Sequence, residues 1–409
     1  MKYGSREVPL AFNKEAARLS HLEPEVNFSP EQFRELLGSS LPLGDGILPD
    51  VGIVVADKTR LCQYPTYLPV LTRFLLDFGI RPSAITFHIA YGTHAPQSRE
   101  ECLECYGETY QHYRFVHHNS RAVEAFQDLG TTTRGTSVLI SREVLQHDLL
   151  ITFGSILHHY FAGFGGGRKL LFPGLAAYDS ILENHRLFLD FEAKSLAQGC
   201  QSGQLDNNPL ALDLEEISSM LPPHLELHAL LNSHKEVCEI YAGKSYADFR
   251  EVCRRYDSFF RSTEEQQYDL VVASAGGYPK DINFIQAHKS IHNAASFVKN
   301  GGKLIIFVEC RDGIGNPDLM DLFLMGERNT IFDSLAENYK NNAGTALSML
   351  EKSGRINIQM VTMLSEEECR LMGAGKCSPN DVQQIIDQEI IDQEKGSMAI
   401  LENAAMLYR

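Results

Sequence analysis

A largely apolar segment that leads directly into a glycine-rich stretch restricts the folds open to this chain. Residues 148–153 have the apolar content of a buried strand in a parallel sheet. Four glycines follow within five positions, just before an Arg168-Lys169 pair: Gly163, Gly165, Gly166 and Gly167. In open α/β sheets, ligands bind at the carboxyl ends of the strands. We therefore expect residues 158–185 to form a ligand site at such an edge.

Apolar runs and helical patterns alternate along the rest of the chain. The expected strands are 51–56, 84–90, 114–117, 137–140, 268–273, 303–308, 356–363 and 398–401. The expected helices are 65–78, one from Ser98, 177–188, 209–220, 246–261 and one near Asn283. This alternation predicts an α/β fold built from doubly wound, mostly parallel sheets flanked by helices.

The chain is expected to form two domains. At 409 residues it is too long for one ordinary hydrophobic core. Residues 262–267 are polar and lack apolar periodicity, which places a boundary there. We expect an N-terminal α/β domain at 1–265 and a smaller Rossmann-like domain at 266–409. Before the first strand the pattern is weak, apart from a turn predicted at Pro42–Gly46.

Charge and composition exclude several classes of function. A net charge of −16 argues against a nucleic-acid surface, so an anionic ligand needs a local positive pocket. The first residues lack a signal-peptide pattern, and no apolar run approaches the roughly 20 residues that span a bilayer. Nine scattered cysteines suit a reducing cytoplasm, and the pair Cys102 and Cys105 suits one face of a helix.

The glycine-rich stretch is not an ordinary nucleotide loop. A P-loop requires Ser or Thr after its lysine, whereas Leu170 follows Lys169 here. A dinucleotide fingerprint requires a third glycine, and Leu170 occupies that position too. The glycines still allow backbone N–H groups to turn inward as an anion nest beside a cation, which suits a phosphate. The alternative is a loop whose histidines only bond to backbone carbonyls.

Residues 159–169 read HYFAGFGGGRK, with PG at 173–174 and NH at 184–185. This pattern resembles the nickel-dependent lactate racemase family. The resemblance implies that Lys169 carries a covalently attached nickel pincer nucleotide, pyridinium-3,5-bisthiocarboxylic acid mononucleotide, which grips the metal through sulfur and a ring carbon. It also implies that His185, sixteen residues after the lysine, is the protein's nickel ligand.

Other blocks match the same family in the same order. Asp57, Thr59 and Arg60 follow an early expected strand, and a Gly-x-His loop ends at His94. A glycine-proline turn at 276–279 precedes Gln286 and Lys289, whose spacing of three puts them on one helical face. The matching blocks therefore extend over roughly 50–290 of the sequence. The resemblance implies an active site in the cleft between the two domains.

The family chemistry implies a role for each matched residue. A 2-hydroxy acid would be racemised or epimerised by reversible hydride transfer from Cα to the cofactor, through a planar 2-keto acid. His94 and His159 would exchange the hydroxyl proton, since the histidine pKa near 6.5 suits both directions. The other roles concern binding. Arg60, Lys289 and Gln286 would hold the substrate, Asp57 would orient Arg60 or the cofactor, and Thr59, Gly165, Gly166, Gly167 and Arg168 would bind the cofactor.

The substrate need not be lactate. The chain has no tryptophan, and Ile285 stands where the family is expected to have tyrosine. His158, His288 or His292 could contribute to specificity. Alternatives remain a non-racemising enzyme with the same nickel cofactor, and a nucleotide-binding protein without metal. The chain lacks the HExxH or paired-cysteine motif that would indicate a zinc hydrolase. Expected partners are a small hydroxy acid and the enzymes that synthesise the cofactor; the oligomeric state is left open.

Overall fold

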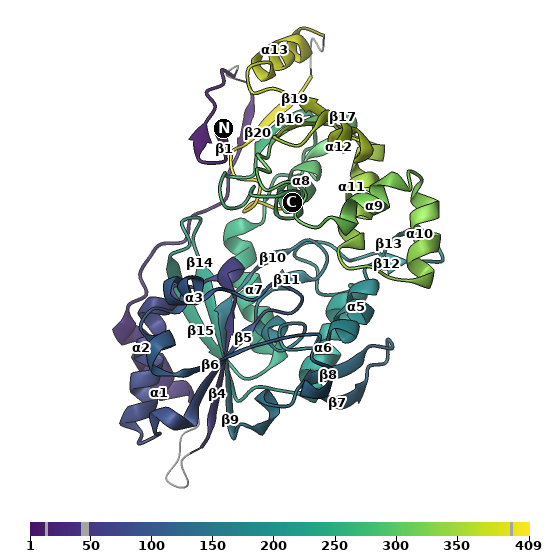
Figure 1. Cartoon of the computed structure of the whole chain (residues 1–409). Coiled ribbons are helices and arrows are strands. Elements are labelled where there is room, and N and C mark those ends of the chain that lie inside the picture. The colour runs from purple at the N-terminus through teal and green to yellow at the C-terminus, as the bar shows by residue number, and fades with distance from the viewer. Residues whose placement is uncertain (13–14, 42–48, 393–395) are drawn as a thin grey trace. The chain divides into compact units, whose positions relative to one another are not determined.

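The computed structural model describes residues 1–12, 15–41, 49–392 and 396–409 (Figure 1). The turn predicted at Pro42–Gly46 lies outside these residues. Contacts divide the chain into two compact units. We call residues 23–187 and 199–259 the first unit, and residues 1–22, 188–198 and 260–409 the second unit.

These units differ from the two continuous segments expected from the sequence. Strand β3 (Ala17–Leu19) pairs in parallel with β20 (Met398–Leu401), which joins the start of the chain to the second unit. The hairpin of β12 (Leu189–Asp190) and β13 (Ser195–Leu196) also belongs there, and Lys194 within it pairs with Asp333 at 2.6 Å. Pairings between residues far apart in sequence thus decide the membership of both segments.

The first unit contains a six-stranded sheet in the order β15-β14-β9-β4-β5-β6. Its strands are β4 (Val51–Ala56), β5 (Ile85–Ala90), β6 (Arg114–His117), β9 (Leu149–Ser155), β14 (Leu225–Leu231) and β15 (Val237–Gly243). Neighbours pair in parallel except β14 and β15, an antiparallel edge pair that was not predicted from the sequence. The strand order reverses between β4 and β9.

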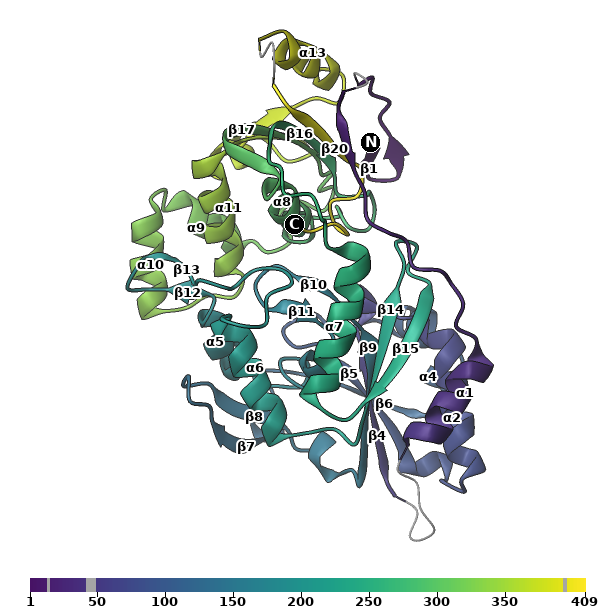
Figure 2. The same cartoon turned by 180° about the vertical axis from the view of Figure 1, so that it is seen from behind.

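Helices cover both faces of this sheet. They are α1 (Pro30–Ser40), α2 (Tyr64–Asp77), α3 (Arg99–Tyr106), α4 (Thr109–His112), α5 (Tyr178–Arg186), α6 (Pro209–Met220) and α7 (Tyr246–Phe260). Opposite views place α1 and α2 on one face, and α5 and α6 on the other (Figures 1 and 2). Local chemistry sets their ends: Ser98 forms a capping box with Glu101 before α3, and Asn208 caps α6. Cys102 and Cys105 are both buried on α3, as predicted.

Two short antiparallel hairpins complete the first unit. They are β7 (Phe126–Thr131) with β8 (Ser137–Ser141), and β10 (Leu157–His159) with β11 (Gly163–Gly165). The second of these hairpins lies within the glycine-rich stretch, so that stretch has regular structure of its own.

The second unit contains a parallel six-stranded sheet in the order β19-β18-β17-β16-β20-β3. Besides β3 and β20, its strands are β16 (Tyr268–Ser274), β17 (Val298–Phe307), β18 (Asn357–Val361) and β19 (Gly375–Cys377). Its helices are α8 (Phe284–Ala295), α9 (Asp318–Leu324), α10 (Arg328–Glu337), α11 (Ala343–Arg355), α12 (Glu366–Leu371) and α13 (Val382–Asp392). The strands β1 (Lys2–Tyr3) and β2 (Arg6–Glu7) form a small hairpin. The predicted α/β class with two parallel-dominated sheets is confirmed.

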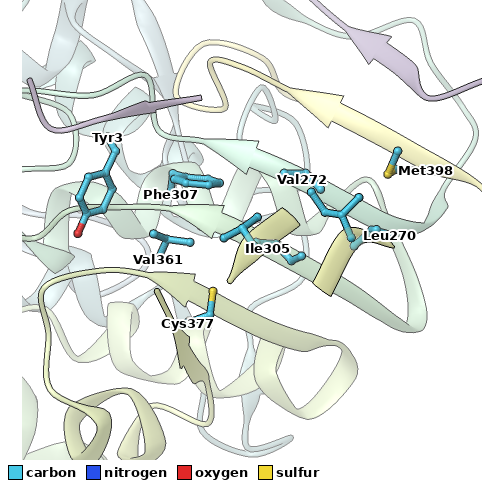
Figure 3. Packing of buried hydrophobic residues seen from close by; sticks show 10 residues of the cluster. Tyr3, Leu270, Val272, Ile305, Phe307, Val361, Cys377 and Met398 are labelled. Carbon is cyan, nitrogen blue, oxygen red and sulfur yellow. The ribbon is translucent and has the colours of Figure 1, made fainter. Parts of the chain in front are cut away.

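Alternate side chains of neighbouring strands form an apolar cluster on one face of this second sheet (Figure 3). Val272 on β16 and Ile305 and Phe307 on β17 are fully buried. Tyr3 of β1 packs edge-on against Phe307, with 6.4 Å between ring centroids. Removing such side chains from water is the main source of stability for the unit.

In the part of the chain that the structure describes, no helix is both long enough and apolar enough to cross a membrane. All nine cysteines are free and buried.

Candidate active site

The sheet topology of the first unit brings two distant loops to one place. Strands β4 and β9 are parallel neighbours, and the strand order reverses between them. Such a reversal opens a crevice at the carboxyl ends of the strands. The 3-10 turn Lys58–Arg60 follows β4, and the β10–β11 hairpin and the turn Gly167–Leu170 follow β9. Both sets of predicted site residues therefore follow the carboxyl ends of neighbouring parallel strands.

Asp57 organises the loop after β4. Nδ1 of His94 lies 2.6 Å from Oδ2 of Asp57, while Oδ1 accepts hydrogen bonds from the Thr59 hydroxyl at 2.6 Å and the Thr59 amide at 3.0 Å. Burial alone would raise the pKa of Asp57, but the hydrogen bonds from His94 and Thr59 and the nearby charges lower it to about 2. Asp57 is therefore ionised. The His94 side chain is 45% exposed, so its ring is accessible to a bound molecule.

The glycine loop is tightly packed at two positions and accepts no side chain there. Gly166 has φ +80°, and a Cβ there would lie 2.1 Å from the carbonyl oxygen of Ser155. Gly167 has φ +50°, and its Cβ would lie 2.5 Å from the Phe249 ring. Only glycine fits both constraints. The backbone therefore requires glycine at both positions, and the phosphate cradle predicted from the sequence stays a prediction.

Gly165 has a different environment from its neighbours. A Cβ there would meet Leu157 at 3.4 Å and Nε of Arg60 at 3.8 Å, which are ordinary contacts. The guanidinium group of Arg60 therefore lies beside the glycine loop. Its Nη1 also donates to the Thr59 hydroxyl at 3.2 Å. The loops after β4 and β9 thus meet through Arg60.

One aromatic ring connects three of the predicted residues. The Phe161 ring centroid lies 4.4 Å from that of His159, 5.2 Å from that of His185 and 5.4 Å from Nζ of Lys169. Burial, with the charges of Lys169 and His94, lowers the pKa of His185 to about 3. The imidazole is therefore neutral, the form that binds metals.

No role was predicted for Phe161 from the sequence. It stands between a histidine and a glycine in the matched string, without a signal that distinguishes it from a core residue. Its contacts with His159, His185 and Lys169 depend on the hairpin and on helix α5 folding back onto the loop.

The two adjacent histidines of β10 have separate environments. Nε2 of His158 lies 2.6 Å from Oδ1 of Asp257 on α7, and its ring packs against Phe164 and Tyr256. Successive side chains of a strand point to opposite faces, and His159 accordingly contacts Phe161 instead. The geometry therefore favours His159 as the histidine of the candidate site.

The Arg168 side chain packs against helix α7. Its guanidinium carbon is 4.6 Å from the centroid of the Phe249 ring and 5.5 Å from that of Tyr246, both on α7. Nη2 donates to the carbonyl of Ala162 at 3.4 Å, whereas Nε and Nη1 have no hydrogen-bond partner among the described residues. Its predicted contact with a cofactor stays a prediction.

The remaining predicted residues belong to the second unit. Nζ of Lys289 donates to Oε1 of Gln286 at 2.7 Å, so the two side chains share one face of α8, as the spacing predicted. His288 is fully buried, and burial and the charge of Lys352 hold the pKa of both His288 and His292 well below the usual value. That these residues complete a site across a cleft stays a prediction.

His185 is the predicted metal ligand of this site. Among residues 1–12, 15–41, 49–392 and 396–409, no three His, Cys, Asp or Glu side chains are placed to hold a metal ion together. In the family that the sequence resembles, an organic cofactor supplies the other ligands of the metal. The amine of Lys169, which contacts the same Phe161 ring as His185, is a suitable point of attachment for such a group.

Comparison with known proteins points to one family. A family model described as lactate racemase N-terminal domain matches residues 48–196, and one described as lactate racemase C-terminal domain matches residues 263–347. A lactate racemase of Thermoanaerobacterium thermosaccharolyticum is 30% identical over 299 residues, which cover 71% of this chain and 68% of that protein. One of Lactiplantibacillus plantarum is 30% identical over 268 residues, 65% of this chain and 61% of that protein.

Solved structures have the same fold. The lactate racemase apoprotein from Thermoanaerobacterium thermosaccharolyticum superposes with a TM-score of 0.85 at 23% identity, covering 100% of this chain and 99% of that chain. A protein from Thermotoga maritima superposes with a TM-score of 0.71 at 18% identity, covering 96% and 100%. The two-domain α/β architecture is therefore shared with both.

Proposed function

This chain belongs to the lactate racemase family, whose members are isomerases, and we propose that it racemises or epimerises a 2-hydroxy acid with a nickel pincer nucleotide attached to Lys169. The observation that carries the proposal is the arrangement around Phe161. Its ring contacts His159, His185 and Lys169, which are the predicted base, nickel ligand and attachment point. The coarser conclusion, that the chain is a racemase-type isomerase, rests on the family itself.

The residues of the first unit fit this cofactor. Lys169 would form the covalent attachment, and neutral His185 would bind nickel, which accepts imidazole together with soft sulfur ligands. The backbone at Gly166 and Gly167 would bind the phosphate, and Gly165, Thr59 and Arg168 would add further contacts to the cofactor. When bound, the group supplies an acceptor that takes the Cα hydride of the substrate and can return it to the opposite face.

The pair of Asp57 and His94 is suited to move the hydroxyl proton of the substrate. Because Asp57 is ionised and faces Nδ1 of His94, it stabilises the tautomer that carries its proton on Nδ1. Nε2 is then the basic nitrogen that accepts the hydroxyl proton. His159 would perform the same task for the opposite enantiomer, since inversion requires a base on each side of Cα.

Binding of the substrate carboxylate falls to Arg60 in this proposal. Its guanidinium group lies beside the glycine loop at Gly165, and a planar guanidinium pairs well with a carboxylate. Lys289 and Gln286 of the second unit would add bonds to the substrate. The absence of tryptophan suggested a substrate other than lactate, and that substrate assignment remains part of the proposal.

Intact-protein mass and nickel content test the proposal directly. The protein would be produced together with the cofactor-synthesis enzymes, and we expect the mass of one sulfur-bearing mononucleotide and about one nickel per chain. Lys169→Arg keeps the positive charge beside Phe161 but should abolish both the added mass and the nickel. Lys244→Arg, at an exposed position, is the control.

A chiral assay with a panel of 2-hydroxy acids then identifies the substrate. Interconversion of the enantiomers of at least one acid other than lactate is expected. Activity on lactate alone would overturn the substrate part of the proposal. An unmodified, metal-free wild-type chain under the same conditions would overturn the cofactor part and favour a nucleotide-binding protein without metal.

A further inference from the structure

The residue before the proposed nickel ligand is held by a buried carboxylate. Asn184 is fully buried in the last turn of α5, and its Nδ2 donates to Oδ2 of Asp213 on α6 at 2.8 Å. Consecutive helical residues point about 100° apart, so Asn184 turns toward Asp213 while His185 contacts Phe161. A bond at Asn184 therefore fixes the rotation of the turn that carries His185.

Asp213 is a hydrogen-bond hub without exposure to solvent. Its Oδ1 accepts from the Thr132 hydroxyl at 2.6 Å, and its Oδ2 accepts from the Thr136 hydroxyl at 2.7 Å as well as from Asn184. The residue is 0% exposed, so these donors replace the water that a carboxylate requires. Both threonines belong to the connection between β7 and β8. Helix α5, helix α6 and the connection between β7 and β8 thus meet at the side chain of Asp213.

Helix α5 depends on side-chain contacts because it has only nine residues and no side-chain cap at its N-terminus. Isolated helices of that length are unstable in water. The Ser180 hydroxyl accepts from the amide of Leu139 at 3.3 Å, and the carboxylate of Glu183 accepts from the amide of Ser137 at 2.7 Å. Glu183 is exposed, whereas the Asn184 bond is buried and adjacent to His185.

We propose that Asp213 is a positioning residue that holds His185 ready to bind nickel, acting through Asn184. The proposal rests on the proposed function, because it assumes that His185 is the nickel ligand. A charged acceptor makes a stronger and shorter hydrogen bond than a neutral one. The last turn of α5 is therefore held in one orientation before metal arrives, which lowers the cost of ordering the ligand. Partners of this kind typically change metal affinity by about 10- to 100-fold.

Nickel retention by the loaded enzyme tests this proposal. Loaded protein would be challenged with a chelator, and nickel loss would be followed while intact mass reports the lysine adduct. We expect Asn184→Ala to lose nickel about tenfold faster than wild type with the adduct retained. Asn184→Ala leaves both threonine bonds to Asp213 intact, so folding should survive, and thermal unfolding would check this.

Three further variants separate positioning from general stability. Asp213→Asn keeps one oxygen that can accept from Asn184 but loses the charge and the second acceptor, so its nickel loss should fall between that of wild type and that of Asp213→Ala. Glu183→Ala is the matched control, because it removes a tether of the same helix without touching Asn184. Nickel loss from Asn184→Ala at the wild-type rate, or equally fast loss from Glu183→Ala, would overturn the proposal.

A measurement on unloaded protein keeps this proposal distinct from the proposed function. Should wild type carry neither adduct nor nickel, the proposed function fails, and histidine-selective NMR still reports the His185 ring. One sharp set of His185 ring signals is expected in wild type and Glu183→Ala, with broadened or doubled signals in Asn184→Ala. Unchanged signals in Asn184→Ala would overturn the positioning role by themselves.

Discussion

Nε2 of His158 lies 2.6 Å from Oδ1 of Asp257, which ties strand β10 to helix α7 on the face opposite His159. The ring of His158 is also enclosed by Phe164 and Tyr256. Because β10 has only three residues, a constraint on His158 is also a constraint on its neighbour. We infer that this pair fixes the direction in which His159 points.

Replacing Asp257 should disturb His159 without removing it. Asp257→Ala leaves His158 buried without its acceptor, which we expect to cost about 1–3 kcal/mol of the free energy of unfolding. The racemisation rate should fall roughly tenfold, since a small misplacement of a catalytic group lowers the rate. Asp257→Asn retains an acceptor for His158, so it should keep most of the stability and most of the racemisation rate. Ser258→Ala, one residue further along α7, is the control. Equal racemisation rates for Ser258→Ala and Asp257→Ala would contradict the prediction.

The two neighbouring glycines Gly165 and Gly166 should respond differently to alanine. At Gly166 a Cβ meets the carbonyl oxygen of Ser155 at 2.1 Å and φ is +80°, so the loop must move. Gly166→Ala should lose about 1–3 kcal/mol of the free energy of unfolding and prevent modification of Lys169. Gly165→Ala meets only ordinary contacts and should stay within about 1 kcal/mol of wild type. Denaturant unfolding and intact mass distinguish the two variants.

Asp57 should contribute to stability above pH 4 and lose that contribution in acid. Its pKa is about 2 in the folded chain, compared with 3.8 for an aspartate without interactions. A depressed carboxyl pKa means that the folded state binds the proton less readily, so stability falls as pH drops from about 4 to 2. The shift corresponds to about 2 kcal/mol. Asp57→Asn should therefore lose less stability than wild type as the pH falls. The control Asp128→Asn, at an exposed position, should depend on pH as wild type does.

The buried Lys352 should destabilise the second unit at neutral pH. Its Nζ donates to the Ser348 hydroxyl at 2.8 Å, yet burial lowers its pKa to about 8, against the opposing effect of Glu351. Below pH 8 the amine is charged in both folded and unfolded chains, so the cost of burying the charge is fully present. Lys352→Met removes this cost but also removes the hydrogen bonds to Ser348. The net effect should raise the free energy of unfolding at pH 7 by about 1–2 kcal/mol.

The pH dependence provides the check on this prediction. Between pH 8 and 10.5 the unfolded chain stays protonated while the folded chain does not, so the advantage of Lys352→Met should shrink as pH rises. The exposed Lys244→Met should show no such trend. A variant that is less stable than wild type at pH 7 would contradict the prediction.

Much of the fold was predictable because local chemistry specifies it. The bounds of β4, β6, α6 and β20 agree with the ranges expected from the sequence, and apolar content or capping residues such as Asn208 explain them. The glycine loop was predictable for the same reason, since Gly166 and Gly167 satisfy a backbone requirement that no other residue meets. The roles assigned to individual site residues stay predictions.

Tertiary structure decided what depends on distant partners. The antiparallel edge strand β15 and the place of Ala17–Leu19 in the second sheet follow from pairings across many residues. The contacts of Phe161, the bond between His158 and Asp257, and the hub at Asp213 likewise join segments that the sequence separates. The sequence by itself determined strands such as β4, β6 and β20, the need for glycine at Gly166 and Gly167, and the family, because those depend on near neighbours or on the residues themselves. Which side chains support the site was decided only when the sheet brought its loops together.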